Sequence, residues 1–126
     1  MDLGRPTDAE LEILTVLWSR GPSTVRAVHD VIGERRTAQY TTILKLLQIM
    51  DEKGLVKRDE SQRAHVYRAA QSREATQTQL AGDLLRRAFD GSAKSLLVGA
   101  LSARKPSKRE IAELKQLLQE FEDNKQ

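Results

Sequence analysis

A chain of 126 residues without cysteine excludes disulfides, thiolate zinc sites and cysteine nucleophiles, and it is long enough to bury a core of its own. The formal net charge of +3 argues only weakly for a polyanionic partner, but ten Lys and Arg residues against six Asp and Glu between Arg20 and Arg68 make the middle of the chain basic. No apolar run is long enough to cross a membrane and the first residues lack the pattern of a signal peptide, so a soluble cytoplasmic protein without membrane contact is expected.

The first helix is predicted by its start signal and its apolar spacing. Thr7 and Glu10 have the spacing of a capping box, in which a hydroxyl and a carboxylate each accept a hydrogen bond from a backbone amide. An apolar stripe follows: Leu11, Leu14, Leu17 and Trp18. The pattern predicts a helix from about Asp8 to Arg20, with these side chains in the core, ended by Gly21-Pro22.

Two further helices follow after short interruptions. Ser23 is the candidate N-cap of the second, which ends near residues 33–36 and has an apolar stripe of Val25, Val28 and Ile32. The third is predicted from Tyr40 to Lys53, closed by Gly54, with a core stripe of Ile43, Leu46, Leu47 and Met50. Its opposite face is small, mostly polar and basic, as a DNA-recognition helix requires: Thr41, Leu44, Lys45 and Gln48.

After Gly54 the pattern changes from helical to alternating. Leu55–Arg58 and Ala64–Arg68 are predicted to be short strands, with Asp59–Gln62 as the polar turn between them. Three helices followed by a small hairpin is the order of a winged helix-turn-helix, whose third helix enters the major groove of DNA. The sequence therefore predicts a mainly α fold with a winged-helix DNA-binding domain over residues 1–70.

Residues 71–126 are predicted to form three more helices. Ser72 can cap the first, Asp90-Gly91 ends it, the apolar segment Lys94–Ser102 forms the second, and a capping box at Ser107-Lys-Arg-Glu110 starts the third. Three apolar helices in about 55 residues are too few to bury their faces alone, so an α-helical dimerisation domain and a homodimer are expected. The side chains expected at that interface are Leu80, Leu84, Phe89, Leu97, Leu101, Ile111, Leu114 and Leu118.

Side chains on the exposed face of the third helix are candidates for contact with double-stranded DNA. Thr41, Thr42 and Lys45 belong to its first turns, where hydroxyls reach phosphates and a lysine reaches phosphate or guanine, although ordinary solvent exposure explains them equally well. Leu44 suits a thymine methyl group or packing against a neighbouring turn, and Gln48 suits adenine or solvent. Both interpretations stay open for each residue.

Aromatic and basic residues flank that helix. Tyr40 can donate its hydroxyl to a phosphate and can also pack its ring beside the second helix. In the hairpin, Arg63 and His65 are candidates for contact with the DNA backbone or minor groove, whereas Tyr67 is expected to anchor the hairpin to the core. His29 is expected to pack or hydrogen-bond near the end of the second helix. Because no carboxylate completes a ligand set with the two histidines, neither a metal nor a cofactor is predicted.

An enzyme is not predicted, because the sequence has no nucleophile paired with a base, no metal-ligand set and no phosphate-binding glycine loop. Two alternatives stay open. The winged helix can bind a protein rather than DNA, since the fold serves both purposes. A DNA-binding protein of this architecture can also sense a small ligand between the helices of its carboxyl-terminal part.

Five motifs occur in order across the predicted winged helix and a sixth follows it: Glu12-Ile-Leu-Thr-Val-Leu-Trp18, Gly21-Pro-Ser-Thr-Val-Arg-Ala-Val-His29, Tyr40-Thr-Thr-Ile43, Glu52-Lys-Gly-Leu-Val56, Arg63-Ala-His-Val-Tyr67 and Ser72-Arg-Glu74. Their combination resembles the penicillinase repressor (BlaI/MecI) family of bacterial transcriptional repressors. The resemblance implies a dimeric winged-helix repressor that binds a palindromic operator and blocks transcription.

The resemblance also implies a route of release. In the best-known members of the family, an antibiotic-sensing membrane metalloprotease triggers cleavage of the repressor within its fifth helix. The Asn-Phe bond cut in those members corresponds to Gly99-Ala100, which makes these residues the candidate cleavage region and a signalling protease a candidate partner. In the hairpin, Gln62 precedes Arg63 where the family often has glycine.

Overall fold

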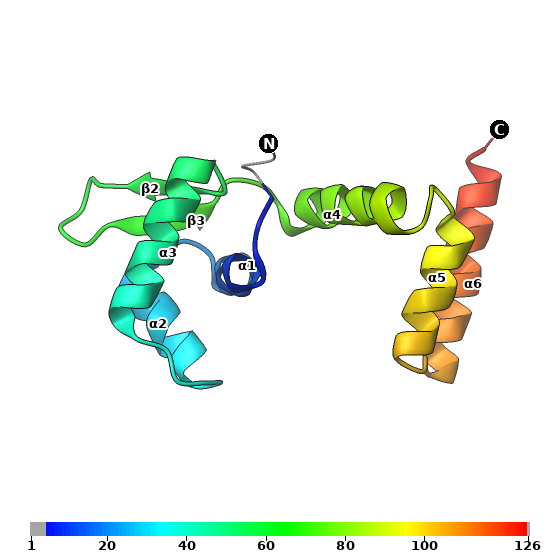
Figure 1. Ribbon diagram of the computed structural model, residues 1–126, viewed down its shortest axis with the longest axis horizontal. Coiled ribbons are helices and arrows are strands. Elements are labelled where there is room, and N and C mark those ends of the chain that lie inside the picture. Colours follow the sequence, from blue (N-terminus) through cyan, green and yellow to red (C-terminus); the bar gives the residue numbers. More distant parts are fainter. Residues whose placement is uncertain (1–4, 126) are drawn as a thin grey trace. The chain divides into compact units, whose positions relative to one another are not determined.

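The computed structural model describes residues 5–125 (Figure 1), which form six helices and three short strands. In chain order these are α1 (Asp8–Arg20), β1 (Ser23–Thr24), α2 (Val25–Gly33), α3 (Tyr40–Lys53), β2 (Val56–Asp59), β3 (Val66–Ala69), α4 (Arg73–Ala88), α5 (Ala93–Ala103) and α6 (Lys108–Asp123). The predicted fold class is confirmed: a winged helix is followed by helices alone. Within residues 5–125, no helix is long and apolar enough to cross a membrane.

The chain divides into two compact units, Met1–Ala81 and Gly82–Gln126, so the division falls inside α4. The first unit therefore contains the whole winged helix and the first two turns of α4. A division into independently folding domains at residues 70 and 71 stays a prediction.

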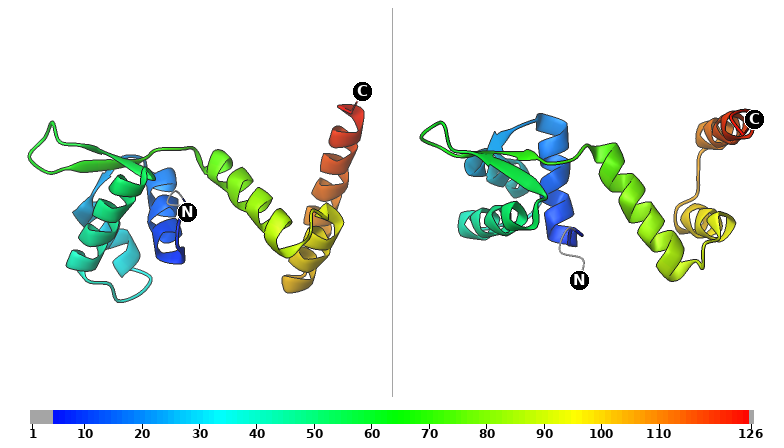
Figure 2. Two further views of the ribbon diagram at one scale, coloured as in Figure 1. Left: turned by 45° about the horizontal axis from the view of Figure 1, so that its top comes forward. Right: turned by 90° about the horizontal axis from the view of Figure 1, so that it is seen from above.

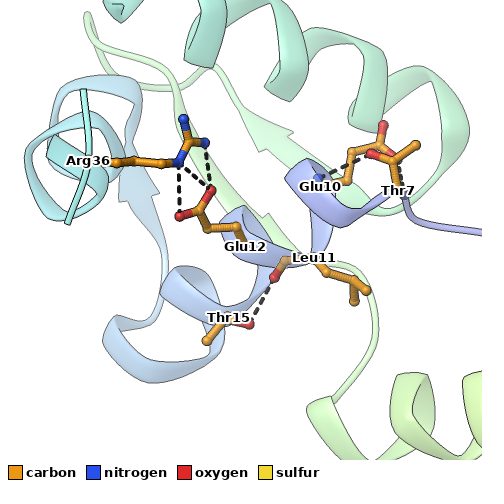
Figure 3. A network of polar contacts seen from close by, with 6 residues as sticks. All are labelled: Thr7, Glu10, Leu11, Glu12, Thr15 and Arg36. Carbon is orange, nitrogen blue, oxygen red and sulfur yellow. Dashed lines mark hydrogen bonds and ion pairs between the residues drawn. The ribbon is translucent and has the colours of Figure 1, made fainter. Parts of the chain in front are cut away.

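The start of α1 is the predicted capping box (Figure 3). Glu10 N donates to Thr7 Oγ1 at 3.2 Å, and Thr7 N donates to Glu10 Oε1 at 2.9 Å. The helix spans the predicted residues, and its buried face is wider than the predicted stripe because Ile13 and Val16 are also buried. Leu11 and Trp18 lie at the edge of the core and are only partly buried.

The prediction of Ser23 as the N-cap of α2 is wrong. Ser23 lies in β1, where it pairs with Tyr67 of β3, and its hydroxyl donates to the carbonyl of Gly21 at 2.8 Å. The cap is Thr24, whose hydroxyl accepts a hydrogen bond from Ala27 N at 3.1 Å. The chain stays extended for one more residue than its sequence suggests, because pairing with β3 satisfies the backbone there.

The three strands form an antiparallel sheet in the order β1-β3-β2. Both hairpin strands begin later than predicted, since Val56 pairs with Ala69 and Asp59 with Val66. His65 therefore lies in the loop rather than in a strand, in a wing that begins where Ser61 N donates to Asp59 Oδ1 at 2.9 Å. In the left view of Figure 2, α1, α2 and α3 lie on one side of the hairpin, and its loop extends beyond them.

One hydrophobic core holds the first unit together. It consists of Ile13, Leu14, Val16, Leu17, Val25, Val28, Ile32, Ile43, Leu47, Met50, Val56 and Tyr67. The predicted role of Tyr67 as the anchor of the hairpin is confirmed, because its side chain is fully buried in this core. Leu46, predicted as a core residue of α3, is only partly buried against the cluster.

The second unit has a different character. None of its described residues is buried, although α5 and α6 have the predicted apolar side chains. The large apolar side chains that are exposed in this unit are Leu84, Leu97, Val98, Ile111, Leu117, Leu118 and Phe121.

Candidate nucleic-acid interface

Helix α3 presents one buried face and one exposed polar face. Ile43, Leu47 and Met50 are fully buried in the core. Lys45 and Gln48, which follow at helical spacing on the other side, are exposed, as are Thr41 and Thr42 in the first turn. The exposed face is thus the predicted one, and its contact with DNA stays a prediction.

The carboxyl-terminal end of α3 is fixed to α1 by a buried ion pair. Lys53 Nζ lies 2.7 Å from Glu10 Oε1, and the side chain of Glu10 is only 3% exposed. Burial by itself raises the pKa of Glu10, but the hydrogen bonds from Lys53 and from the Thr7 backbone amide outweigh it, so the pKa is lowered. Glu10 therefore remains charged and holds both the cap of α1 and the end of α3.

Two contacts hold the segment that leads into α3. Arg36 donates to Glu12 Oε1 through Nε at 3.2 Å and through Nη2 at 2.6 Å (Figure 3), and this guanidinium lowers the pKa of Glu12. His29 Nε2 is 2.8 Å from the carbonyl oxygen of Ala38, which confirms the predicted hydrogen-bonding role of His29. The amino-terminal end of α3 is thereby positioned against α1 and α2.

Tyr40 occupies the start of α3 and packs beside α2, as one of its two predicted roles requires. Its ring meets the His29 ring edge to face, with centroids 5.9 Å apart. The Arg26 guanidinium lies 5.4 Å from the Tyr40 ring centroid. Because Tyr40 remains partly exposed, packing does not remove it from the surface.

A hollow of about 520 Å³ separates α3 from the wing and brings several predicted residues together. From α3 it is lined by Tyr40, Leu44 and Gln48, and from the wing by Arg63 and His65. Leu44 is partly buried and packs against the core, and its contact with a thymine methyl group stays a prediction. Thr41, Thr42 and Lys45 do not line the hollow and belong to the outer face of the helix.

The wing contributes a charge cluster that the sequence did not reveal. Arg58 of β2 also lines the hollow, and its Nη2 lies 3.0 Å from Glu60 Oε1. The same carboxylate oxygen is 3.9 Å from His65 Nε2. Arg58 pairs with the buried Tyr67 across the ladder, so only the strand register assigns it to this face. Of residues 5–125, no group of three or more His, Asp and Glu could hold a metal ion.

The residues predicted for dimerisation and cleavage lie in the second unit, Gly82–Gln126, which we call the arm, except Leu80, which belongs to the first unit. Leu84, Leu97, Ile111 and Leu118 are exposed, whereas Leu80, Phe89, Leu101 and Leu114 are partly exposed. Gly99 and Ala100 are exposed residues in the middle of α5, and a methyl group added at Gly99 would be 3.6 Å from the Phe89 ring. Dimerisation through these side chains and cleavage at Gly99-Ala100 stay predictions.

Comparison with known proteins identifies relatives over most of the chain. A family model described as penicillinase repressor matches residues 6–120. The chain is 39% identical over 98 residues to the transcriptional regulator BlaI of two Mycobacterium tuberculosis strains, an overlap that covers 76% of this chain and 71% of the relative. It is 26% identical over 119 residues to the penicillinase repressor of Bacillus licheniformis, which covers 94% of this chain and 93% of the relative.

Proposed function

The chain belongs to the penicillinase repressor family of DNA-binding transcriptional repressors, which are not enzymes, and on this premise we propose that it is a homodimer that binds a palindromic operator through two copies of α3. The observation that carries the proposal is the exposed polar face of α3 beside a wing that supplies Arg58, Arg63 and His65. Bound at an operator, this face lies in the major groove and the wing lies along the backbone. The half-sites are then about one helical turn or more apart.

The amino-terminal end of α3 supports this orientation. Among residues 5–125, each of the other five helices begins with a Ser or Thr hydroxyl that accepts a hydrogen bond from a backbone amide of the first turn. In α3 the N-cap is Gln39, whose side chain makes no such bond, and the first turn contains no acidic residue. Amides without a side-chain acceptor at a helix start favour an anion, and a DNA phosphate supplies one.

The exposed apolar side chains of the arm support the homodimer. Leu118 is 59% exposed and Phe121 is 69% exposed, and Leu84 and Leu117 are each 47% exposed. Apolar surface of this extent in a small unit, none of whose described residues is buried, indicates a partner surface. A second copy provides the same surface in a twofold arrangement and also provides the second α3 that a palindrome requires.

Operator binding is tested by selecting duplexes from a random pool with the full-length chain and titrating the selected site at two salt concentrations. We expect an inverted repeat and an affinity that falls steeply with salt, because phosphate contacts release counterions. The competing function is a winged helix that binds a protein. Selection without an enriched repeat and affinity without salt dependence would favour that function.

Release by proteolysis within α5 is a second part of the proposal. A cut between Gly99 and Ala100 would separate α6, with Leu118 and Phe121, from the rest of the arm. A chain that ends at Gly99 is therefore expected to be monomeric in sedimentation experiments and to lose affinity for the palindrome. A truncated chain that still forms dimers would show that a cut at this bond does not release the operator, whatever protease makes it.

A further inference from the structure

The start of α4 is attached to α1 by a small cluster, which we call the Trp18 clamp and which consists of Trp18, Ser19, Gln71 and Arg73. Trp18 Nε1 donates to the carbonyl oxygen of Gln71 at 3.0 Å. The Arg73 guanidinium lies 5.9 Å from the Trp18 ring centroid, and its Nη2 donates to Ser19 Oγ at 3.1 Å. Besides starting α4, the motif Ser72-Arg-Glu74 therefore contacts α1 through Arg73.

Neighbouring contacts fix where α4 begins and how it leaves the sheet. Ala70 N donates to the carbonyl oxygen of Leu55 at 2.9 Å, and the Ser72 hydroxyl caps the helix by accepting from Ala75 N at 3.0 Å. One turn later Thr76 is buried, the only residue of α4 that is. The first half of α4 is therefore part of the DNA-binding unit rather than a free linker.

The division between the two units comes directly after this fastened half, between Ala81 and Gly82. Glycine inside a helix is less favourable than alanine, because its backbone has more conformational freedom to lose on folding. A Cβ added at Gly82 would meet only the end of the Arg86 side chain, at an ordinary contact distance of 3.6 Å. Neither a close approach of other atoms nor a positive φ angle requires glycine at position 82. Its effect is therefore to lower the helix stability of α4 at this position.

We propose that Trp18 and Arg73 are positioning residues that determine which spacing of operator half-sites the protein accepts, with Gly82 as the point at which α4 yields. This inference rests on the proposed function, a dimer on two half-sites. In such a dimer the separation and helical phase of the two α3 copies are transmitted through α4. A fastened first half confines the freedom of each DNA-binding unit to Gly82, so a wrong spacing must bend the helix there.

The test uses the full-length chain and a set of duplexes in which the spacer between the selected half-sites is shortened or lengthened by one to five base pairs. The measured quantity is the ratio of affinities for the best and the out-of-phase spacer. Arg73→Ala is expected to lower this ratio about three- to tenfold, the effect of losing one cation–π contact and one hydrogen bond. Gly82→Ala is expected to raise it. A mere loss of positive charge lowers all affinities by the same factor and leaves the ratio unchanged.

Matched controls make the outcomes distinct. Gln77→Ala replaces an exposed residue of the same helix and should leave the ratio unaltered. Trp18 is the only tryptophan of the chain, so its fluorescence reports whether Arg73→Ala has opened the clamp. The inference fails if the emission changes while the ratio does not, and equally if the emission is unaffected, because the clamp then does not form in solution. Failure of the unmodified chain to bind any duplex would instead overturn the proposed function.

Discussion

Replacing Lys53 by methionine should destabilise the first unit more than replacing its partner Glu10 by glutamine. The two side chains form the ion pair between α1 and the end of α3, at 2.7 Å, but they are not equally buried. Glu10 is 3% exposed, whereas Lys53 is 19% exposed. A lysine left without its partner can turn its ammonium group toward water, and a carboxylate left in the core cannot.

The expected magnitudes follow from this asymmetry. Lys53→Met leaves a buried carboxylate without a cationic partner, with Thr7 as its remaining hydrogen-bond donor, and breaking a buried pair in this way costs about 3 kcal/mol. Glu10→Gln keeps an acceptor for the Thr7 amide, because glutamine also forms a capping box, and should cost about 1 kcal/mol. The double variant should be more stable than the sum of both losses predicts, since it leaves no charge unpaired.

The pH dependence provides a second signature. In the unmodified chain the folded-state pKa of Glu10 lies below its ordinary value of 4.5, so its contribution to stability is present above pH 4.5 and is lost as the pH falls through the folded-state pKa. Without Lys53, burial is no longer outweighed and the pKa of Glu10 should rise. The cost of Lys53→Met should then be smallest below pH 4.5 and should grow as the pH rises to neutrality.

Urea unfolding of the four proteins between pH 3.5 and 7.5 measures these free energies, with Trp18 fluorescence as the signal for the first unit. An equal cost for both single variants would refute the reasoning from unequal burial. A cost of Lys53→Met that does not change with pH would show that Glu10 is not left charged and unpaired.

Three further predictions concern DNA binding and assembly. Lys45→Ala should weaken operator binding about tenfold in fluorescence anisotropy without changing the dimer seen in sedimentation, and an unchanged affinity would remove Lys45 from the interface. Glu60→Gln should strengthen binding about threefold and steepen its salt dependence, because it frees Arg58 and His65 for phosphates, and a weaker complex would contradict this. Leu118→Glu should give monomers that bind one half-site about as well as before and the palindrome far more weakly, whereas intact dimers would place the interface elsewhere.

The helices of the first unit were predictable because their signals are local. The capping box at Thr7 and the stripe after it give the exact span of α1, and Gly54 marks the end of α3. Strand β1 was not predictable in the same way. It has two residues, and Ser23 resembles an N-cap until its pairing with Tyr67, 44 residues later, is known.

The same distinction between local signals and long-range contacts applies to the residues of the candidate site. The exposed face of α3 follows from helical periodicity, so Lys45 and Gln48 could be assigned to it from the sequence. The position of Arg58 beside the hollow could not be assigned from the sequence. It depends on the register between β2 and β3, which differs from the register that the apolar pattern suggests. Nor does any local pattern pair Glu10 with Lys53, since the capping box already explains Glu10.

The exposed apolar side chains of the arm show why its apolar composition was enough to predict a partner surface. A unit in which Phe121 is 69% exposed and no described residue is buried gains little free energy by folding alone, since each large apolar side chain contributes about 1.5–3 kcal/mol only when it is fully buried. In the proposed homodimer that burial takes place between chains, so folding of the arm and association are one process. The stability of α5 and α6 then depends on chain concentration, whereas that of the winged helix, which has its own core, does not. In the proposed homodimer, any signal that weakens the arm is therefore expected to release the operator while leaving each α3 folded.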